Sequence, residues 1–243
     1  MSLISAFVVS LISITGIVLF ALTDKFVQKI LLLLVSFSTG ALIGGAFFHL
    51  LPEALETSEN VILIFGFVLV GFSVFFILER LLRWHHCHDM ECTTRQHLGQ
   101  LNLIGDAVHN ILDGIIIFST FSVSPALGIP VTLSIIFHEL PQEVSDFGVL
   151  LYSGFSKTKA LLYNFLVALG TVLGVLIGVV LLKHFENINL FFLPFAAGVF
   201  IYIAASDLIP EMHKEVKFSK SMVSFAIFII ALLFMLGLKL IAE

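Results

Sequence analysis

The sequence predicts an all-α integral membrane protein with eight transmembrane helices. Of the 243 residues, 59% are hydrophobic and only 12% are charged, and the mean hydropathy is +1.11. A soluble domain of this size cannot bury so much apolar surface, so the chain needs lipid around it. The apolar residues also fall into segments of roughly 20 residues, the length of helix that crosses a bilayer core. We therefore treat residues 1–243 as a single transmembrane domain in a lipid bilayer.

Each predicted span is bounded by turn residues or charges. The first has no charged leader and no convincing cleavage site, so we expect a retained span and not a removed signal peptide. Charged turns follow the first span at 23–25 and the fifth at 156–159, and Pro125 and Gly128 mark the turn before the fifth. The fourth and fifth spans are the least apolar because they carry most of the intramembrane charges. The predicted spans are 2–22, 28–51, 60–81, 101–121, 127–152, 159–182, 188–210 and 221–240.

The basic residues give the predicted orientation. Ten of the twelve lysines and arginines lie in or beside the connections that follow the first, third, fifth and seventh spans; only Lys183 and Lys239 lie elsewhere. Because loops rich in Lys and Arg stay in the cytoplasm, both termini are expected outside it. The net charge of −5 and the lack of a basic run give no reason to expect a nucleic-acid partner. We expect a plasma (inner) membrane protein of a prokaryote, because no large N-terminal domain or complex leader precedes the first span.

A repeated motif relates the second and seventh spans. Gly40 is followed by His-Leu-Leu-Pro-Glu at 49–53, and Gly198 is followed at the same spacing by Asp-Leu-Ile-Pro-Glu at 207–211. These spans run in opposite directions in the predicted topology, so helices 1–3 and 6–8 would be inverted repeats in a 3+2+3 arrangement. The alternative is that two similar helix ends arose by chance. The repeat predicts pathway ends at His49 and Glu53 on the outer side and at Asp207, Glu211 and His213 on the inner side.

Spans 4 and 5 carry the polar residues that suggest chemistry. On a helix His109 and Asp113 share one face, one turn apart, and in span 5 His138 pairs in the same way with Gln142. Further polar residues at helical spacing follow on both spans, and the outermost two, Asp106 and Asp146, are expected at the ends of the pathway. The nine groups are Asp106, His109, Asn110, Asp113, His138, Glu139, Gln142, Glu143 and Asp146.

Ionised groups in these spans need a counter-charge. Each costs about 2.5–3.5 kcal/mol at mid-bilayer, so Asp113, Glu139 and Glu143 together would cost roughly 8–10 kcal/mol. No Lys or Arg lies between Arg95 and Lys157, so the counter-charge is expected to be a passing cation or a set of protons. Imidazole beside carboxylates favours Zn²⁺, Fe²⁺, Co²⁺ or Cu²⁺ over Mg²⁺ and Ca²⁺. The pattern predicts a metal site; the alternative is that these groups hydrogen-bond to one another and hold the two helices together.

At these residues the chain resembles the ZIP family of divalent metal transporters, and in particular its LIV-1-like branch. The signature H-N-x-x-D-G stands at 109–114, and His-Glu-Leu-Pro-Gln-Glu at 138–143 resembles the H-E-x-P-H-E form of that branch. The resemblance covers essentially the whole chain. It implies zinc uptake toward the cytoplasm by alternating access, between a block of helices 1, 4, 5 and 6 and a block of helices 2, 3, 7 and 8. Zn²⁺ is the expected substrate, with Fe²⁺, Mn²⁺, Cd²⁺ and Co²⁺ as further candidates; a homodimer is considered, and no organic cofactor is expected.

The resemblance also implies two neighbouring metal positions. Gln142 stands where the LIV-1 form has a second His, and helix 6 offers only Asn164 and Thr171 where some relatives carry a metal-binding carboxylate. These departures bear on whether two metals bind at once and on which metal is preferred. The implied ligands are His109, Asp113, His138 and Gln142 at the first position and Asn110, Glu139 and Glu143 at the second.

Residues 84–100 form a predicted cytoplasmic loop between helices 3 and 4 that is rich in metal-binding side chains. Three histidines and two cysteines within eight residues could bind Zn²⁺ without a preformed fold. The alternative is a flexible polar linker. The predicted loop ligands are His85, His86, Cys87, His88 and Cys92.

Three other function classes compete. A membrane metalloprotease would need H-E-x-x-H, but Gln142 stands at the second His and Pro141 bends the helix, so we do not expect an enzyme. A broader metal-dependent membrane hydrolase stays an alternative. A proton-coupled carrier of a small organic substrate would explain the acids but not the two histidines. Besides an enzyme and a carrier, the remaining class is a metal-sensing receptor that binds the metal without transporting it.

Overall fold

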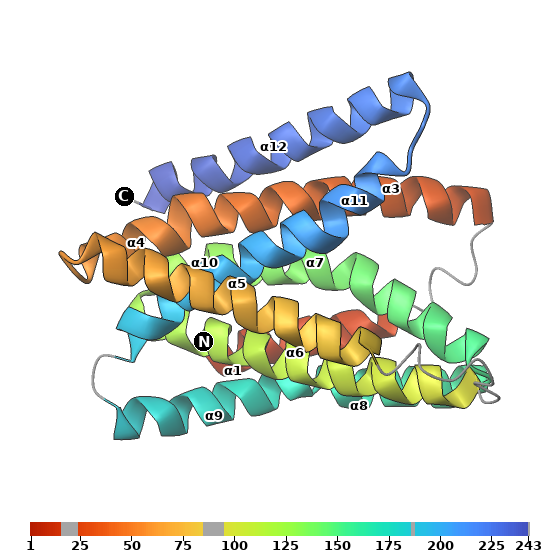
Figure 1. Cartoon of the computed structure of the whole chain (residues 1–243), viewed down its shortest axis with the longest axis horizontal. Coiled ribbons are helices and arrows are strands. Elements are labelled where there is room, and N and C mark those ends of the chain that lie inside the picture. Colours follow the sequence, from red (N-terminus) through yellow and green to blue (C-terminus); the bar gives the residue numbers. More distant parts are fainter. Residues whose placement is uncertain (16–23, 85–94, 186–187, 243) are drawn as a thin grey trace.

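The computed structural model is all-helical over the residues that it describes, which are 1–15, 24–84, 95–185 and 188–242. The helices lie roughly along one long axis, and the connections between them gather at the two ends of the molecule (Figure 1). Helical structure occupies each of the eight predicted spans within the described ranges. The predicted loop ligands at 85–92 lie outside the described residues.

The helices follow the predicted spans closely, with local departures. The sixth span is divided at Leu169 into two helices, and the second and seventh each contain a π-helical turn. The elements are α1 (Ser2–Leu11) with a 3₁₀ turn (Ile12–Thr15), α3 (Asp24–Gly44), η2 (Gly45–Leu50), α4 (Leu51–Glu56), α5 (Val61–Trp84), α6 (Arg95–Val123), α7 (Pro125–Tyr152), α8 (Lys157–Ala168), α9 (Gly170–His184), α10 (Asn189–Ile203), η3 (Ala204–Leu208), α11 (Ile209–His213) and α12 (Phe218–Ala242).

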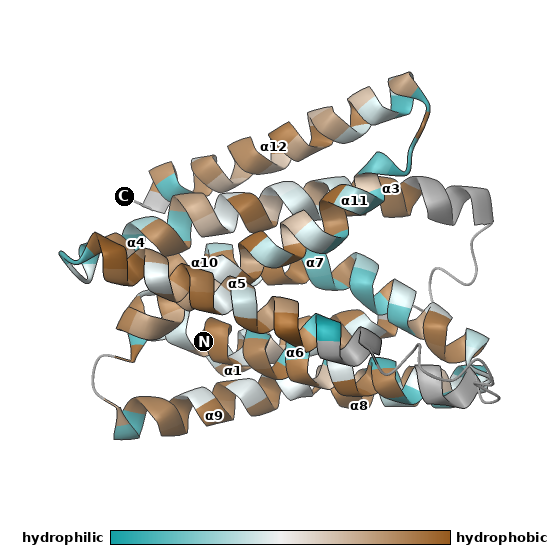
Figure 2. Cartoon of the chain, in the orientation of Figure 1, coloured by the Kyte–Doolittle hydropathy of each residue, from teal (hydrophilic) through white to brown (hydrophobic). Residues whose placement is uncertain are grey.

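Six helical stretches are long and apolar enough to cross a membrane, so the predicted number of eight spans is not confirmed. The apolar helix at the N-terminus is described only as far as Thr15 and is short. The 28-residue α7 is long enough, but it carries the polar residues of the fifth predicted span, which lower its hydropathy. Figure 2 shows this hydrophilic half of α7 among largely apolar helices. The six stretches are Ile30–Glu56, Val61–Arg80, Gly99–Val123, Lys157–His184, Asn189–His213 and Phe218–Ile241.

Burial separates inner helices from outer ones. Over an 18-residue apolar window within the stretch 189–213, 61% of the residues are buried. The share is 56% for such a window in 30–56 and only 17% in α5 and in α12. The exposed residues of the two outer helices are large and apolar, such as Ile62 and Leu233, as expected for a surface in contact with lipid chains. Of the inner stretches, 30–56 packs directly against α7, which carries the polar half.

The two sequence motifs that repeat also have the same local structure. The π-helical turns η2 and η3 each lead into a short α-helix with proline near its start, Pro52 in α4 and Pro210 in α11. Proline has no N–H to continue an α-helical ladder, and π-helical turns are frequent at functional sites. The repeat in sequence thus coincides with a repeat in backbone geometry.

Both repeats also pack closely against an outer helix. A Cβ atom added at Gly40 of α3 would lie 2.4 Å from the carbonyl oxygen of Phe228 in α12, and one at Gly198 of α10 would lie 2.0 Å from that of Val68 in α5. Only glycine permits backbones to approach this closely. The pairs α3 with α12 and α10 with α5 are therefore built in the same way.

Candidate metal centre

Four potential ligands from two neighbouring helices converge in the interior. His109 and Asp113 come from α6, and His138 and Glu139 from α7; one ligand atom of each lies within 4.8 Å of all the others. The Nε2 atom of His109 is 3.1 Å from that of His138 and 3.1 Å from Oε1 of Glu139. The Nε2 atom of His138 is 3.2 Å from Oδ2 of Asp113. Two imidazole nitrogens and two carboxylate oxygens thus surround one point.

This four-residue cluster is buried, and its carboxylates are short of hydrogen bonds. Asp113 is fully buried, and His138 and Glu139 are each 1% exposed. Both oxygens of Asp113 and Oε1 of Glu139 accept no well-aligned hydrogen bond within the described ranges, although Oδ2 of Asp113 and Oε1 of Glu139 lie 3.2 Å and 3.1 Å from imidazole nitrogens. Buried carboxylate oxygens usually have a donor or a cation beside them. A mixed nitrogen and oxygen set without thiolate suits Zn²⁺ and similar ions, so the residues present fit a divalent transition metal.

The orientation of His138 favours a ligand role for its Nε2 atom. Nδ1 of this ring lies 3.1 Å from the carbonyl oxygen of Ser134, one turn earlier in α7, and donates its proton there. Histidines that bind metals commonly donate their second N–H to a backbone carbonyl, which fixes the ring and leaves the other nitrogen unprotonated. The arrangement leaves the Nε2 lone pair directed at the centre of the cluster.

Two phenylalanines from other helices cover the imidazoles. Phe75 of α5 lies edge-on to His109 with ring centroids 5.7 Å apart, and Phe200 of α10 lies edge-on to His138 at 6.1 Å. Phe200 is fully buried and Phe75 is 8% exposed. In the described part of the chain, α5 and α10 thus contribute an apolar wall to the centre, while α6 and α7 contribute its ligands.

The other three predicted ligands, Asn110, Gln142 and Glu143, lie in a neighbouring network of hydrogen bonds. Asn110 donates to Asp106 Oδ1 at 2.9 Å, and Gln142 donates to the same oxygen at 3.4 Å. Glu143 accepts a hydrogen bond from Asn164 of α8. None of the three belongs to the four-residue cluster; Glu139 lies there instead of Gln142, which the resemblance had grouped with His109, Asp113 and His138.

Further hydrogen bonds involve residues from other parts of the polar stretch. Thr171 of α9 donates to Asn110 Oδ1 at 2.8 Å, and Asn102 donates to Asp146 Oδ1 at 3.0 Å. Asn102 did not figure among the predicted site residues, although its place four residues before Asp106 on the same helix could have indicated it. Phe75 and Phe200 were also missed, and in a chain with 26 phenylalanines nothing in the sequence distinguishes them.

The predicted pathway ends on the repeats lie outside the cluster. His49 is 2% exposed, and its Nε2 lies 2.9 Å from the carbonyl oxygen of Met235 in α12; Glu53 is half-buried. Glu211 is exposed and pairs with Lys214. The remaining two, Asp207 and His213, are also exposed.

Hydroxyl groups of α3 and α7 join these helices beside the site. Pro141 has no N–H to donate to the carbonyl of Phe137, which would be its usual partner in an α-helix. The hydroxyl of Ser38 in α3 donates to that oxygen instead. Ser134 of α7 donates in the other direction, to the carbonyl of Ala41 at 3.0 Å. The proline therefore creates an acceptor that ties α7 to α3.

The family model described as ZIP Zinc transporter matches residues 1–91 and 83–239. Zinc transporter YKE4 of Saccharomyces cerevisiae is 32% identical over 218 residues, which cover 77% of this chain and 63% of that protein. Zinc transporter ZIP13 of Pongo abelii is 32% identical over 199 residues, covering 75% and 58%, and human zinc transporter ZIP10 is 35% identical over 142 residues, covering 54% and 17%.

The chain spans less than two thirds of the length of these three relatives. The match nevertheless extends over nearly all of its own residues and includes every helix that carries the centre. ZIP10, ZIP13 and YKE4 are LIV-1-like proteins, which agrees with the form of the motif at 138–143. The chain therefore belongs to the ZIP family of zinc transporters.

Proposed function

We propose that the chain carries Zn²⁺ across the membrane and binds it in transit between His109, Asp113, His138 and Glu139. The observation that carries this proposal is the convergence of four buried potential ligands, three of whose carboxylate oxygens accept no well-aligned hydrogen bond within the described ranges. The names of the relatives support transport over a hydrolase, a sensor or an organic-substrate carrier.

The ligand set accounts for both binding and release. Two carboxylates carry two negative charges, so a bound divalent ion makes the centre neutral and removes much of the cost of burying it. Neutral imidazoles add the nitrogen ligands that Zn²⁺ favours over Mg²⁺ and Ca²⁺. The absence of thiolate from the proposed set favours exchange over permanent retention. Fe²⁺, Mn²⁺, Co²⁺ and Cd²⁺ stay candidates as further substrates.

We also propose the finer architecture: eight spans in a 3+2+3 arrangement, with α1 in the first span and α7 as the fifth. The matching π-helical turns and the matching pairs α3–α12 and α10–α5 support inverted repeats, because a pseudo-two-fold axis that exchanges helices 2 and 7 also exchanges 3 and 8. The four ligands would then belong to the block of helices 1, 4, 5 and 6, and the wall of Phe75 and Phe200 to the other block. Movement of one block against the other would uncover the metal on alternate sides.

The proposed direction is uptake, with both termini outside the cytoplasm. The turns 153–156 and 214–217 lie at the same end of the molecule (Figure 1), next to five of the twelve basic residues. The positive-inside rule assigns that end to the cytoplasm. A divalent ion moving inward gains roughly 4.6 kcal/mol per 100 mV of inside-negative potential, twice the value for a single charge. A plasma-membrane location and a homodimer stay predictions.

Zinc flux into liposomes tests the proposal. The purified chain is reconstituted with a zinc-sensitive dye inside, and His138→Ala and Asp113→Asn are compared with two exposed controls, His184→Ala and Glu59→Gln. We expect saturable influx in the wild type and both controls and its loss in both site variants. Stoichiometric zinc binding by the wild type without flux under any voltage or pH gradient would instead support the sensor or hydrolase alternatives.

A further inference from the structure

A groove of about 890 Å³ opens between α3 and the turn that joins α11 to α12. It lies where α12 diverges from α3 toward its N-terminal end (Figure 1). The lining from α3 is apolar and consists of Leu31, Leu32, Leu33 and Val35, and Val223 adds an apolar side chain from α12. One side of the groove could therefore accommodate a hydrocarbon chain.

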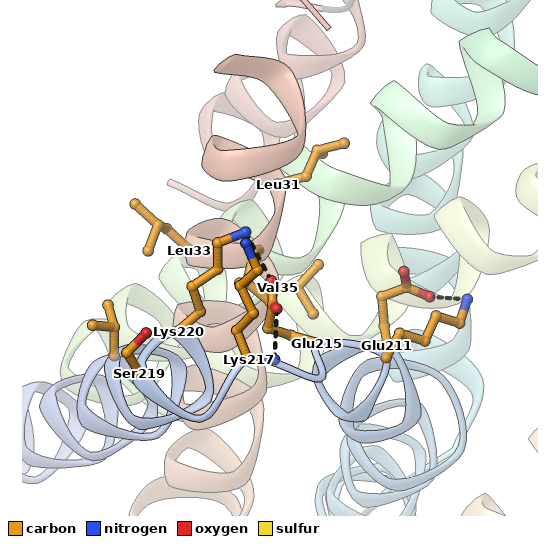
Figure 3. A pocket seen from close by; sticks show the side chains of 11 residues that line it. Leu31, Leu33, Val35, Glu211, Glu215, Lys217, Ser219 and Lys220 are labelled. Carbon is orange, nitrogen blue, oxygen red and sulfur yellow. Dashed lines mark hydrogen bonds and ion pairs between the residues drawn. The ribbon is translucent and has the colours of Figure 1, made fainter. Parts of the chain in front are cut away.

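The other side of the groove is charged. The ammonium of Lys220 lies 3.0 Å from Oε2 of Glu215, and the main-chain N–H of Lys217 donates to Oε1 of the same carboxylate at 2.9 Å. Figure 3 shows Glu215, Lys217 and Lys220 together at the start of α12, with Glu211 farther away. Glu211 forms an ion pair with Lys214, and both residues also line the groove. The N–H of Lys217 and the ammonium of Lys220 together lower the pKa of Glu215, so this carboxylate stays ionised at neutral pH. Three ammonium groups over two carboxylates leave the lining with a net positive charge.

The groove lies at the boundary of the apolar spans. The stretch 30–56 begins one residue before Leu31, the stretch 189–213 ends one residue before Lys214, and 218–241 begins one residue after Lys217. On this basis the apolar lining belongs to the edge of the hydrocarbon region. Lys214 and Lys217 lie outside the apolar stretches, and Lys220, the third residue of its stretch, is close enough to the boundary for its ammonium to reach the lipid headgroups. This placement depends on hydropathy alone and holds for either orientation of the chain in the membrane.

We propose that this groove binds a phospholipid with an anionic headgroup, the acyl chain lying along α3 and the phosphate beside Lys217 and Lys220. Basic pockets between transmembrane helices are typical binding sites for anionic lipid headgroups. A zwitterionic headgroup would bring its own ammonium toward three others, so the charge of the groove favours the anionic lipid. The bound lipid would fill the space between α12 and α3 and hold the end of α12 near the bundle. The site is independent of the zinc centre.

Native mass spectrometry of the full chain in detergent tests the proposal. The protein is incubated with equal amounts of dioleoyl phosphatidylglycerol and dioleoyl phosphatidylcholine, and bound copies of each are counted. We expect preferential retention of one phosphatidylglycerol and a rise in the melting temperature with this lipid only. The double variant Lys217→Gln/Lys220→Gln should weaken retention about tenfold or more, since each lysine near a membrane surface contributes roughly a fivefold factor.

Two further variants make the result specific. Lys157→Gln/Lys159→Gln removes two ammonium groups at the start of α8, outside the groove, and should retain phosphatidylglycerol as the wild type does. Val223→Trp fills the apolar part and should reduce the retention of both lipids while leaving the melting temperature in detergent unchanged. Equal retention of the two lipids by the wild type, or undiminished phosphatidylglycerol binding in Lys217→Gln/Lys220→Gln or in Val223→Trp, would overturn the proposal.

Discussion

The close approach of α6 and α9 predicts a severe effect of Gly114→Ala. Gly114 follows the proposed ligand Asp113, and a Cβ atom at this position would lie 2.0 Å from the carbonyl oxygen of Thr171 and 2.8 Å from the Cα atom of Gly174. Both are backbone atoms, so no side chain can rotate away. To reach the 3.4 Å at which ordinary contact begins, the two helices would have to separate by about 1.4 Å, which a close-packed interior resists.

This displacement bears on both stability and transport. Overpacking of this kind costs about 1–3 kcal/mol, partly offset by the roughly 1 kcal/mol that alanine gains over glycine in a helix. Because α6 carries two of the four ligands, a shift of about 1 Å is expected to reduce the rate of zinc transport on the order of 100-fold. The same close approach accounts for the glycine that follows aspartate in the motif at 109–114.

Liposome flux and thermal unfolding measure the two effects, and the chain supplies matched controls. A Cβ atom at Gly148 of α7 or at Gly66 of α5 would meet no atom within 4 Å. Gly148→Ala and Gly66→Ala should therefore keep wild-type flux and melt at the same temperature or slightly higher. Wild-type flux and stability in Gly114→Ala would show that α6 and α9 are not packed as described, and the argument would fail.

Three further predictions concern the centre itself. Glu139→Gln should weaken zinc binding, measured by equilibrium dialysis, at least about tenfold, and Gln142→Ala should weaken it less, because only Glu139 belongs to the four-residue cluster. A larger loss of zinc affinity in Gln142→Ala than in Glu139→Gln would favour the grouping implied by the family resemblance. Phe200→Ala should lower the free energy of unfolding by about 3–5 kcal/mol through the cavity that it creates, whereas Phe225→Ala, at an exposed position, should change it little. Equal melting temperatures for the two variants would contradict the packing of Phe200 against the centre. Mg²⁺ and Ca²⁺ in about 100-fold excess should not inhibit zinc influx, because neither ion favours imidazole. Strong inhibition would argue against histidine ligands.

The positions of the helices could be predicted from the sequence because the signal is long and cumulative. An apolar stretch such as 60–81 is long enough to cross a bilayer and too apolar for the surface of a soluble protein, and α5 (Val61–Trp84) follows it closely. The break at Leu169 and the π-helical turns could not be predicted, since they depend on which backbone carbonyls find partners in neighbouring helices. Hydropathy alone does not identify the fifth span, because the polar residues of the candidate site make α7 less apolar than the six helical stretches that are apolar enough to cross a membrane.

Which residues share the centre could be predicted only in part. Helical spacing placed His109 with Asp113 on one face of α6, and these two lie together in the structure. For α7 the same rule paired His138 with Gln142, but His138 and its neighbour Glu139 converge instead. Helical periodicity gives the faces of each helix but not the rotation of one helix against another, and the length of the Glu139 side chain lets its carboxylate reach Nε2 of His109. The contribution of Phe75 and Phe200 depends on tertiary packing alone.

Anomalous scattering at the zinc edge would locate zinc in crystals of the protein soaked with this ion. We expect a peak between the four proposed ligand atoms of His109, Asp113, His138 and Glu139, at about 2.0–2.2 Å from each atom that coordinates it. A peak held instead by Asn110, Gln142 and Glu143, or zinc confined to residues 85–92, would contradict this expectation.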